Sequence, residues 1–442
     1  MTREEDLVRS TASAIAETVR EVPPLRLSAA PAPGAPRPSA PRVRRLRSWL
    51  APVAAAAAVL ALAISLVAIK SLHSGPVPAA ARSGSAVAVP TYYVAPEASC
   101  TSCQSTRLVV ADTRTGAKLA TVDPPRGTSF VAVSAAADDR TFVAATVGYP
   151  FKLNQQQVTW YLVKITPDAA TPVRMTRLSI PNTPPASSVG TVALSPSGGE
   201  LAVTYQFRQV APSTIALRIY SVSSGRLLHS WSTTTSAVPH ALFHFAPFTV
   251  GNNDLNWVDG GRALSFTTVS DAGNTSSDSR AQLAVRTLNM AAADGDLIRD
   301  SRVVWSTRYQ ANELNCADGL NSPRLSADGR TVVCAEGDNL STGADRSVKH
   351  QAFPIKWLTY QISDPSAVRI LREFTVHVTG SHREALTSVQ WANGSGSTLI
   401  VSWFVRSTTY PTLHFGVISH GTYTPLPTPP GILLGTPPNV AW

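Results

Sequence analysis

The four cysteines are the residues with the most specific chemistry in this sequence. Cys100 and Cys103 form a C-x-x-C pair, and Cys316 and Cys334 lie much later in the chain. A C-x-x-C pair acts as a redox centre where it opens a helix after a strand, and four cysteines bind zinc only where all of them converge. The C-T-S-C run here stands instead in an expected loop before a strand. Four cysteines allow three pairings, of which we expect Cys100 with Cys103 and Cys316 with Cys334.

Two histidines, His240 and His244, are spaced as a pair of metal ligands on a helix would be. On a helix this spacing lets both imidazoles bind one metal ion. The segment is bounded by Pro239 and Pro247, which predicts a loop or an irregular strand. We therefore interpret both histidines as packing or surface residues.

Aspartates also recur at turns, where Asp254 and Asp259 flank Trp257 and Asp328 stands in a matching turn. Such residues usually accept hydrogen bonds from backbone N–H groups of their own turn. Calcium needs several oxygen ligands close together, and no D-x-D-x-D run occurs. The sequence also lacks the G-x-S-x-G, P-loop, G-x-G-x-x-G and H-E-x-x-H motifs. It therefore predicts no catalytic, cofactor-binding or metal-binding residues.

A strand–turn–strand unit that recurs five times must position any site in this chain. Each copy has a run of β-forming residues, a polar turn with Asp or Gly, and a second such run. The turns contain Asp139, Gly199, Gly261, Gly329 and Gly396, about 60 to 70 residues apart. Further hairpins are predicted at Leu108–Thr121 and Leu217–Trp231. The repeat is thus four strands, and such blades stack around an axis as an all-β propeller.

The two ends of the repeat region predict how the ring closes. Tyr92–Val122 supplies strands without an inner hairpin, and Trp442 occupies the place that Trp257 and Trp391 hold at the end of an inner strand. We therefore expect a six-bladed β-propeller whose last blade is closed by N- and C-terminal strands, with five or seven blades as alternatives. These tryptophans and Trp403 form either a ligand-stacking set or, as their regular placement favours, the core between blades.

A long apolar segment precedes the repeats. Leu50–Ile69 contains no charged residue, and a helix of that length spans the hydrocarbon of a bilayer. Arginines at 42, 44, 45 and 47 crowd its N-terminal side, so the positive-inside rule places residues 1–48 in the cytoplasm. The alternatives are a buried helix and a signal peptide cleaved after the small residues at 79–81. The expected order is a tail helix at 1–27, a Pro/Arg-rich linker at 28–48, a transmembrane helix at 49–70, a linker at 71–89 and an extracytoplasmic propeller at 90–442.

The cytoplasmic tail carries one apolar stripe at helical spacing. Its members are Val8, Ala12, Ile15, Val19 and Val22. A short amphipathic helix is marginal alone in water, so the stripe is expected to dock on a cytoplasmic protein, a second copy or the membrane face. A partly helical tail without a specific partner is the alternative.

Composition excludes two broad classes. The chain is 44% hydrophobic and 15% charged, which is not a disordered composition. Its net charge of +10 is spread along the chain, whereas nucleic-acid binding requires a clustered basic patch. We expect no nucleic-acid partner.

Two motifs resemble a known group of propellers. Ser326–Val332 reads S-A-D-G-R-T-V, and Val110–Leu119 follows V-x-D-x-x-T-G-x-x-L. Both resemble TolB-like, WD40-like and YVTN-type propellers, and the whole layout resembles actinobacterial membrane-anchored proteins of this kind. The resemblance implies the fold and leaves the activity open.

These features favour a non-enzymatic binding, scaffolding or sensing module with no cofactor. Its face would bind an extracytoplasmic protein, peptide or glycan. One alternative is an anti-sigma-like regulator of an extracytoplasmic-function sigma factor, although residues 1–48 lack the His and Cys of the usual zinc motif. Another is a propeller lyase or hydrolase that draws its site from several blades around the central channel.

Overall fold

The computed structural model describes residues 89–98, 106–148, 157–184, 187–207, 214–234, 255–270, 282–308, 316, 323–336, 350–379, 384–406, 412–428 and 440–442. The chain divides into two compact units, residues 1–83 and 84–442, and all described residues belong to the second. The tail helix and membrane span predicted within residues 1–70 lie outside them. Within the described ranges, no helix is long and apolar enough to cross a membrane.

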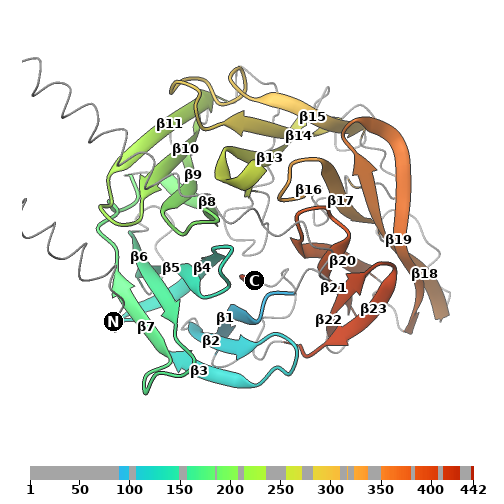
Figure 1. The fold of residues 1–442 in the computed structure, drawn as a ribbon, viewed down its shortest axis with the longest axis horizontal. Coiled ribbons are helices and arrows are strands. Elements are labelled where there is room, and N and C mark those ends of the chain that lie inside the picture. The colour runs from blue at the N-terminus through green and yellow to red at the C-terminus, as the bar shows by residue number, and fades with distance from the viewer. Residues whose placement is uncertain are drawn as a thin grey trace, which may run out of the picture. The chain divides into compact units, whose positions relative to one another are not determined.

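The second unit is an all-β propeller of six antiparallel sheets arranged around a centre (Figure 1). Blade 2 contains β4 (Thr128–Ala135), β5 (Thr141–Gly148), β6 (Val158–Ile165) and β7 (Val173–Arg177). Blade 3 contains β8 (Ser187–Leu194), β9 (Glu200–Phe207), β10 (Thr214–Ser221) and β11 (Leu227–Thr234). Blade 4 contains β12 (Asn256–Val258), the 3-10 turn η1 (Asp259–Gly261), β13 (Ala263–Ser270), β14 (Gln282–Asn289) and β15 (Arg302–Arg308).

The remaining full blades continue the same order around the ring. Blade 5 contains β16 (Arg324–Leu325), β17 (Thr331–Glu336), β18 (His350–Gln361) and β19 (Asp364–Thr379). Blade 6 contains β20 (Glu384–Ala392), β21 (Thr398–Arg406), β22 (Thr412–Ser419) and β23 (Thr422–Leu426). In each of the five, neighbouring strands in the sequence pair in the sheet.

Blade 1 is shared between the two ends of the repeat region. It contains β1 (Tyr92–Ala98), β2 (Thr106–Asp112) and β3 (Lys118–Val122), and Ala441 forms an antiparallel bridge with Val94 of β1. The C-terminal segment thus takes the innermost place of this blade, near the centre of Figure 1. The prediction of six blades, with the last closed by both ends, is confirmed.

The hydrophobic pattern explains why the blades stack. The second strand of a blade is covered on both faces, so β9 and β17 are almost continuous runs of buried residues. The outermost strand meets solvent, and in β7 only intermediate and exposed positions occur. Each apolar cluster joins neighbouring blades: Trp160 of blade 2 packs with Tyr205 of blade 3, and Trp231 of blade 3 packs with Trp257 of blade 4. The core therefore lies in the seams between blades.

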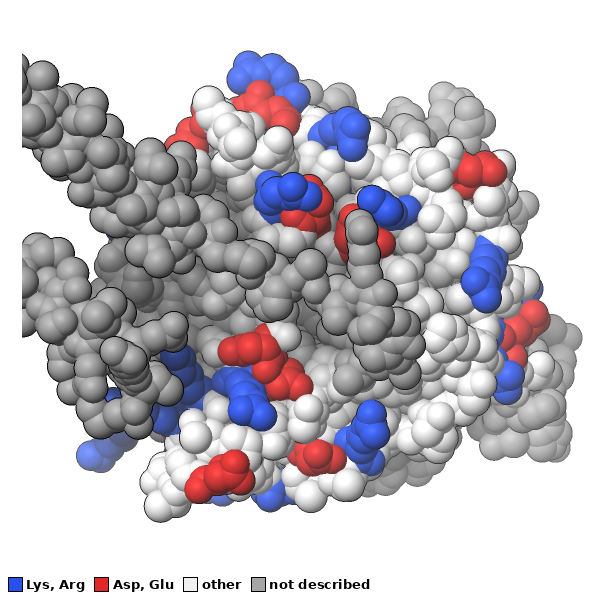
Figure 2. Space-filling view, viewed as in Figure 1, with Lys and Arg blue, Asp and Glu red and all other residues white. Residues whose placement is uncertain are grey.

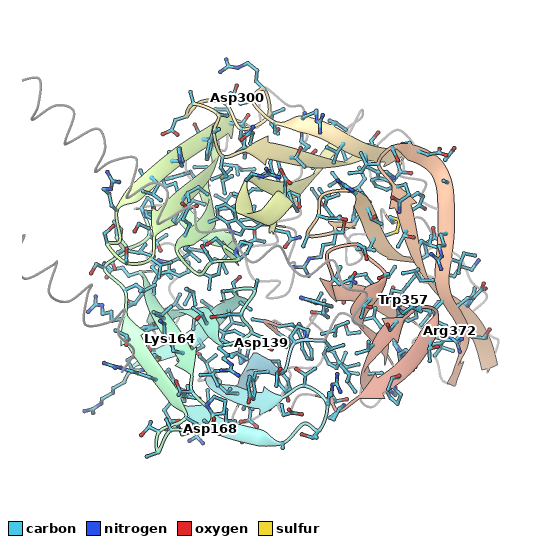
Figure 3. All side chains as sticks on the ribbon, viewed as in Figure 1. Asp139, Lys164, Asp168, Asp300, Trp357 and Arg372 are labelled. Atoms are coloured by element: carbon cyan, nitrogen blue, oxygen red, sulfur yellow. A yellow bond between two sulfur atoms is a disulfide. The ribbon has the colours of Figure 1, made fainter. Side chains whose placement is uncertain are left out.

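The predicted inner hairpins are present, with turns that require a left-handed residue. Asp139, Gly260, Gly261, Gly329 and Gly396 have positive φ. In blade 3 the positive φ belongs to Gly198, one position before the glycine that the pattern singled out. Figure 3 shows Asp139 at the inner edge of the ring, whereas Asp168 lies on the outer rim.

Candidate functional site

A pocket of about 140 Å³ lies where the inner strands of all six blades meet. Blades 2 and 3 contribute Val133–Ala137, Val192–Leu194 and Pro196, and blade 4 contributes Leu255–Trp257. Blades 5 and 6 contribute Arg324, Ala327 and Gln390–Ala392, and the closing segment contributes Val440–Trp442. These are the last residues of the inner strands and the start of their turns, so the pocket lies at the end of the channel formed by the inner-hairpin turns.

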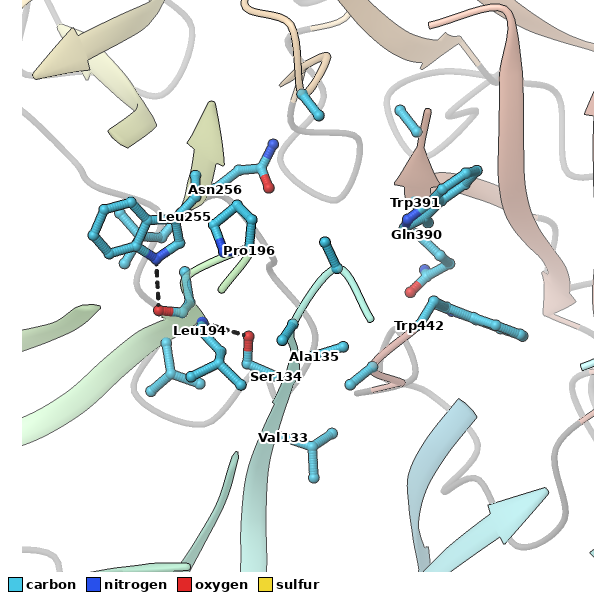
Figure 4. A pocket seen from close by; sticks show the side chains of 18 of the residues that line it. Val133, Ser134, Ala135, Leu194, Pro196, Leu255, Asn256, Gln390, Trp391 and Trp442 are labelled. Carbon is cyan, nitrogen blue, oxygen red and sulfur yellow. Dashed lines mark hydrogen bonds between the residues drawn. The ribbon is translucent and has the colours of Figure 1, made fainter. Parts of the chain in front are cut away.

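Hydrogen bonds between blades hold the lining in place. Leu194 N donates to Ser134 Oγ at 2.9 Å, and Trp257 Nε1 donates to the Ala193 carbonyl at 2.9 Å. Both are drawn in Figure 4. They connect blade 2 to blade 3 and blade 3 to blade 4, so these three inner strands keep a fixed spacing around the pocket.

The same arrangement continues across blades 4, 5 and 6. Asn256 Nδ2 donates to the Leu325 carbonyl at 2.9 Å, and Arg324 Nη1 donates to the Gln390 carbonyl. Each bond joins residues one repeat apart. Residues one repeat apart in the sequence therefore contact each other across neighbouring blades around the ring.

A second layer of bonds lies in the turns. Backbone N–H groups donate across neighbouring blades from Ala137 to the Pro196 carbonyl (3.1 Å), from Asp259 to the Ala327 carbonyl (2.8 Å) and from Asp328 to the Gly394 carbonyl (3.0 Å). Thr91 N donates to Asp139 Oδ2 at 2.6 Å, which joins blade 1 to blade 2. The rim of the pocket is thus built from backbone groups of tight turns.

Gln390 brings a buried polar group to the pocket. The β20–β21 register shifts between Val389 and Trp391, which makes Gln390 the extra residue of a bulge. Its side chain is 3% exposed, and its Nε2 donates to Ser388 Oγ at 2.5 Å and Ser402 Oγ at 3.0 Å. Its Oε1 has no hydrogen-bond partner among the described residues and points toward the pocket in Figure 4. A buried acceptor without a partner is costly, so this oxygen marks a place where a ligand or water is favoured.

Trp391 and Asn256 add polar edges to the lining. Trp391 turns the nitrogen edge of its indole toward the pocket in Figure 4, and no hydrogen bond to a described residue engages that nitrogen. Asn256 reaches toward the pocket from the opposite side, with its amide nitrogen already bonded to Leu325. The lining thereby offers the Trp391 indole donor and two amide acceptors between apolar walls, and the buried Nε1 of Trp442, also a lining residue, has no partner among the described residues.

Arg324 is the one charged side chain among the described lining residues. It donates to the Gln390 backbone, so part of its hydrogen-bonding capacity is used to join blades 5 and 6. Elsewhere the described surface has mixed charge: Figure 2 shows Lys and Arg interspersed with Asp and Glu on the visible face. The pocket therefore differs from its surroundings in having a mostly neutral lining.

The four predicted tryptophans divide into two groups. Trp257, Trp391 and Trp442 line the pocket, and Trp257 and Trp442 are also core residues of the seams, at 4% and 6% exposure. Trp403 lies away from the pocket and stacks on His414, with ring centroids 3.8 Å apart. The set is therefore inter-blade core, with Trp391 in addition presenting a polar edge.

The cysteines and aspartates that drew notice in the sequence have structural roles where they are described. Cys316 and Cys334 form a disulfide with Cα atoms 5.5 Å apart, and both are buried in the seam between blades 4 and 5. Asp328 Oδ1 accepts from Ser326 Oγ at 2.6 Å and from Arg330 N at 3.0 Å, within its own turn. Asp259 bonds the side chain of Arg262.

Other predicted positions lie outside the described residues. They are Cys100, Cys103, His240, His244 and Asp254. Among the described residues, no group of three His, Cys, Asp or Glu side chains is placed to hold a metal ion.

Sequence reasoning missed Gln390, Asn256 and Arg324, although a positional signal exists. Each inner hairpin has a turn residue with positive φ, and the residue five positions before it lines the pocket. In blades 2 to 6 these residues are Ser134, Ala193, Asn256, Arg324 and Trp391. Alignment of the five hairpins on those turns would have marked these positions. Gln390 escapes the rule because the bulge in β20 adds one residue.

No family model and no curated protein matches the chain. Among solved structures, an uncharacterized protein from Listeria monocytogenes aligns with 12% identity and a TM-score of 0.28, over 65% of this chain and 66% of that one. The WD40 domain of SCAP from fission yeast aligns with 10% identity and a TM-score of 0.29, over 72% and 80%. A puromycin-hydrolyzing peptidase from Mycobacterium tuberculosis aligns with 14% identity and a TM-score of 0.35, over 78% of this chain and 46% of the peptidase. This chain thus spans less than half the length of that peptidase.

Proposed function

We propose that this protein is a membrane-anchored, extracytoplasmic β-propeller that acts as a non-enzymatic binding and sensing module. The observation that carries the proposal is the pocket at the channel mouth, where Gln390 Oε1 is buried without a partner among the described residues, beside the indole edge of Trp391. Such a lining, apolar with a few convergent polar groups, is typical of ligand-binding sites. Binding there would involve every blade, because all six contribute to the wall.

The proposed topology follows from the sequence and from cysteine chemistry. The charge-free segment Leu50–Ile69 is long enough to span a bilayer, and the arginines before it favour a cytoplasmic tail. The Cys316–Cys334 disulfide supports a domain outside the reducing cytoplasm. The apolar stripe of the tail would then bind a cytoplasmic protein and connect it to the propeller.

The first test is retrieval of partners by the full-length protein from mild detergent, read by mass spectrometry. A variant with Val8, Ile15 and Val19 replaced by Asn removes the apolar stripe, and a control with Ser10, Ser13 and Glu17 replaced by Asn changes the opposite, polar face. We expect the wild type and the control to retrieve a cytoplasmic protein that the stripe variant loses.

Two results bear on the details. Retrieval of a sigma factor by the tail would identify the protein as a regulator of transcription. Retrieval of the same proteins by all three forms would overturn the proposed sensing role of the tail.

A further inference from the structure

The pocket at the channel mouth restricts which ligand it can accept, by size. Its volume of about 140 Å³ compares with the ~150 Å³ engineered cavity that holds a benzene molecule. A molecule of roughly six non-hydrogen atoms, or the end of a longer one, therefore fits. A complete macromolecular segment does not.

The charge of the lining restricts the ligand further. Arg324 is the one ionisable side chain among the described lining residues, and Trp442 adds the terminal α-carboxylate. The lining residues thus carry one charge of each sign, and the Arg324 guanidinium already donates to the Gln390 carbonyl. Burial of an ion is strongly unfavourable unless a group of opposite charge pairs with it, so a lining whose charges balance favours a neutral molecule.

The polar groups define what that molecule must offer. Gln390 Oε1 needs a hydrogen-bond donor, and the indole nitrogen of Trp391, directed to the same pocket, offers one to an acceptor. The bulge in β20 brings both consecutive residues into the lining, so a ligand that presents a donor next to an acceptor suits both. The apolar side chains of Val133 and Leu255 line the same space and suit a short hydrocarbon part.

We propose that the Gln390–Trp391 pocket binds a small neutral molecule that carries a hydrogen-bond donor beside an acceptor, as a carboxamide or a vicinal diol does. This inference rests on the proposed binding function and specifies its ligand class. Ser134 and Asn256 contribute from blades 2 and 4 on the remaining wall. Gln390 and Trp391 set the specificity, because Figure 4 shows their polar atoms directed into the pocket and neither atom bonds a described residue. The buried Nε1 of Trp442, another lining residue, is a further donor without a partner among the described residues.

The test uses the full-length protein in mild detergent and saturation-transfer NMR with probes of matched size. The probes are propionamide, glycerol, propionate and propylammonium. We expect propionamide and glycerol to bind with a Kd of about 1 mM, the range for ligands of this size, and the two charged probes to bind at least about tenfold more weakly. Equal binding of propionate or propylammonium would overturn the neutral class.

Three variants assign the site. Gln390→Leu removes the acceptor, and Trp391→Phe removes the indole donor while it keeps an aromatic ring. Each is expected to weaken propionamide binding about tenfold or more. The control is Gln361→Leu, because the Gln361 amide donates to Thr331 Oγ1 between β18 and β17 of blade 5 and Gln361 does not line the pocket. Thermal unfolding midpoints establish that each variant is folded.

The remaining outcomes are also decisive. Unchanged binding in folded Gln390→Leu and Trp391→Phe would place the ligand elsewhere and overturn the assignment. Absence of any binding to wild type up to about ten times the expected Kd would overturn the ligand class, while retrieval of a cytoplasmic partner by the tail would still stand. Loss of that retrieval with intact propionamide binding would instead remove the sensing role and keep the pocket.

Discussion

Val94 and Ala441 exchange two backbone hydrogen bonds, with N···O distances of 3.0 and 2.9 Å. Val94 lies in the first described strand and Ala441 next to the last residue of the chain. Beside this bridge, Trp442 packs on Tyr93 of blade 1 and Phe415 of blade 6. The ring is therefore held closed by one short segment.

Replacement of Trp442 by Ala should destabilise the propeller strongly. The side chain is 6% exposed, and truncation of a buried Trp costs about 3 to 5 kcal/mol. Urea unfolding followed by circular dichroism measures the loss. Leu227→Ala is the control, because Leu227 is 43% exposed on β11, and its cost should stay below about 0.5 kcal/mol. Equal costs would contradict the role of Trp442 in closure.

Trp257→Phe should cost more than the lost ring volume alone. Trp257 Nε1 donates to the Ala193 carbonyl across blades, and its loss leaves a buried acceptor without a partner, at about 1 to 3 kcal/mol. The matched control is Trp160→Phe, because Trp160 is similarly buried and its Nε1 has no partner among the described residues. Chemical denaturation of both variants gives the difference, and a smaller cost for Trp257→Phe would contradict the role of this bond.

The Cys316–Cys334 disulfide should resist reductant in the folded protein. Both residues are at most 1% exposed, so a thiol reagent reaches the bond only after local opening. In a Cys100→Ser, Cys103→Ser background, alkylation after dithiothreitol should be slow in buffer and fast in urea, as mass spectrometry would record. Replacement of both cysteines by Ala should lower stability by about 3 kcal/mol, as expected for a loop of this length. Rapid alkylation in buffer would show that the seam opens readily.

Gly225→Ala tests the close approach of blades 2 and 3. A Cβ at Gly225 would lie 2.2 Å from the Ser179 carbonyl oxygen, and the residue has φ +69°. Gly127 has nearly the same φ, +72°, with nothing within 4 Å of a new Cβ, so Gly127→Ala reports the backbone strain alone, about 1 kcal/mol. Gly225→Ala should exceed it by at least about 1 kcal/mol in thermal or urea unfolding. Equal losses would contradict this close approach of the two backbones.

His414 should make stability depend on pH in a defined direction. Burial lowers the pKa of His414 below its usual 6.5, because the charged ring loses its hydration in the folded protein. The ring stacks on Trp403. As the pH falls, His414 therefore takes up a proton at a higher pH in the unfolded chain than in the folded one. Its contribution to stability is fully present above pH 6.5 and is lost as the pH drops below that value. His414→Phe keeps the stack without titration and should flatten this part of the curve. Urea midpoints measured between about pH 7 and 5 compare the two proteins, and identical slopes would contradict the assignment.

Much of the fold could be predicted from the sequence because the same four-strand repeat recurs along the chain. The turn residues at Asp139, Gly329 and Gly396 mark inner hairpins directly, since few residues tolerate a positive φ. The end of the chain at Trp442 matches the inner-strand tryptophans, and this match predicts the closure. The number of blades could thus be predicted because the turn residues and inner-strand tryptophans recur at a regular spacing in the sequence.

The candidate site was less accessible to sequence reasoning, for physical reasons. Its wall takes a few residues from each blade, and contacts such as that between Asn256 and Leu325 join positions one repeat apart. Gln390 reaches the pocket through a bulge in β20, and alternation along a strand does not predict a bulge. A search for motifs looks for neighbours in the chain, whereas this pocket collects one position from each repeat.

The equivalence of the positions before the inner turns has a consequence for how such a protein diversifies. Ser134, Ala193, Asn256, Arg324 and Trp391 occupy one place in the repeat and five places around one cavity. A single substitution at any of them alters one side of the cavity. At Ser134, Asn256 or Arg324 it also removes a hydrogen bond between blades, while the apolar clusters of the seams consist mostly of other residues. Change at this one position of the repeat therefore gives a route by which a closed ring acquires new ligands while the apolar clusters between its blades are kept.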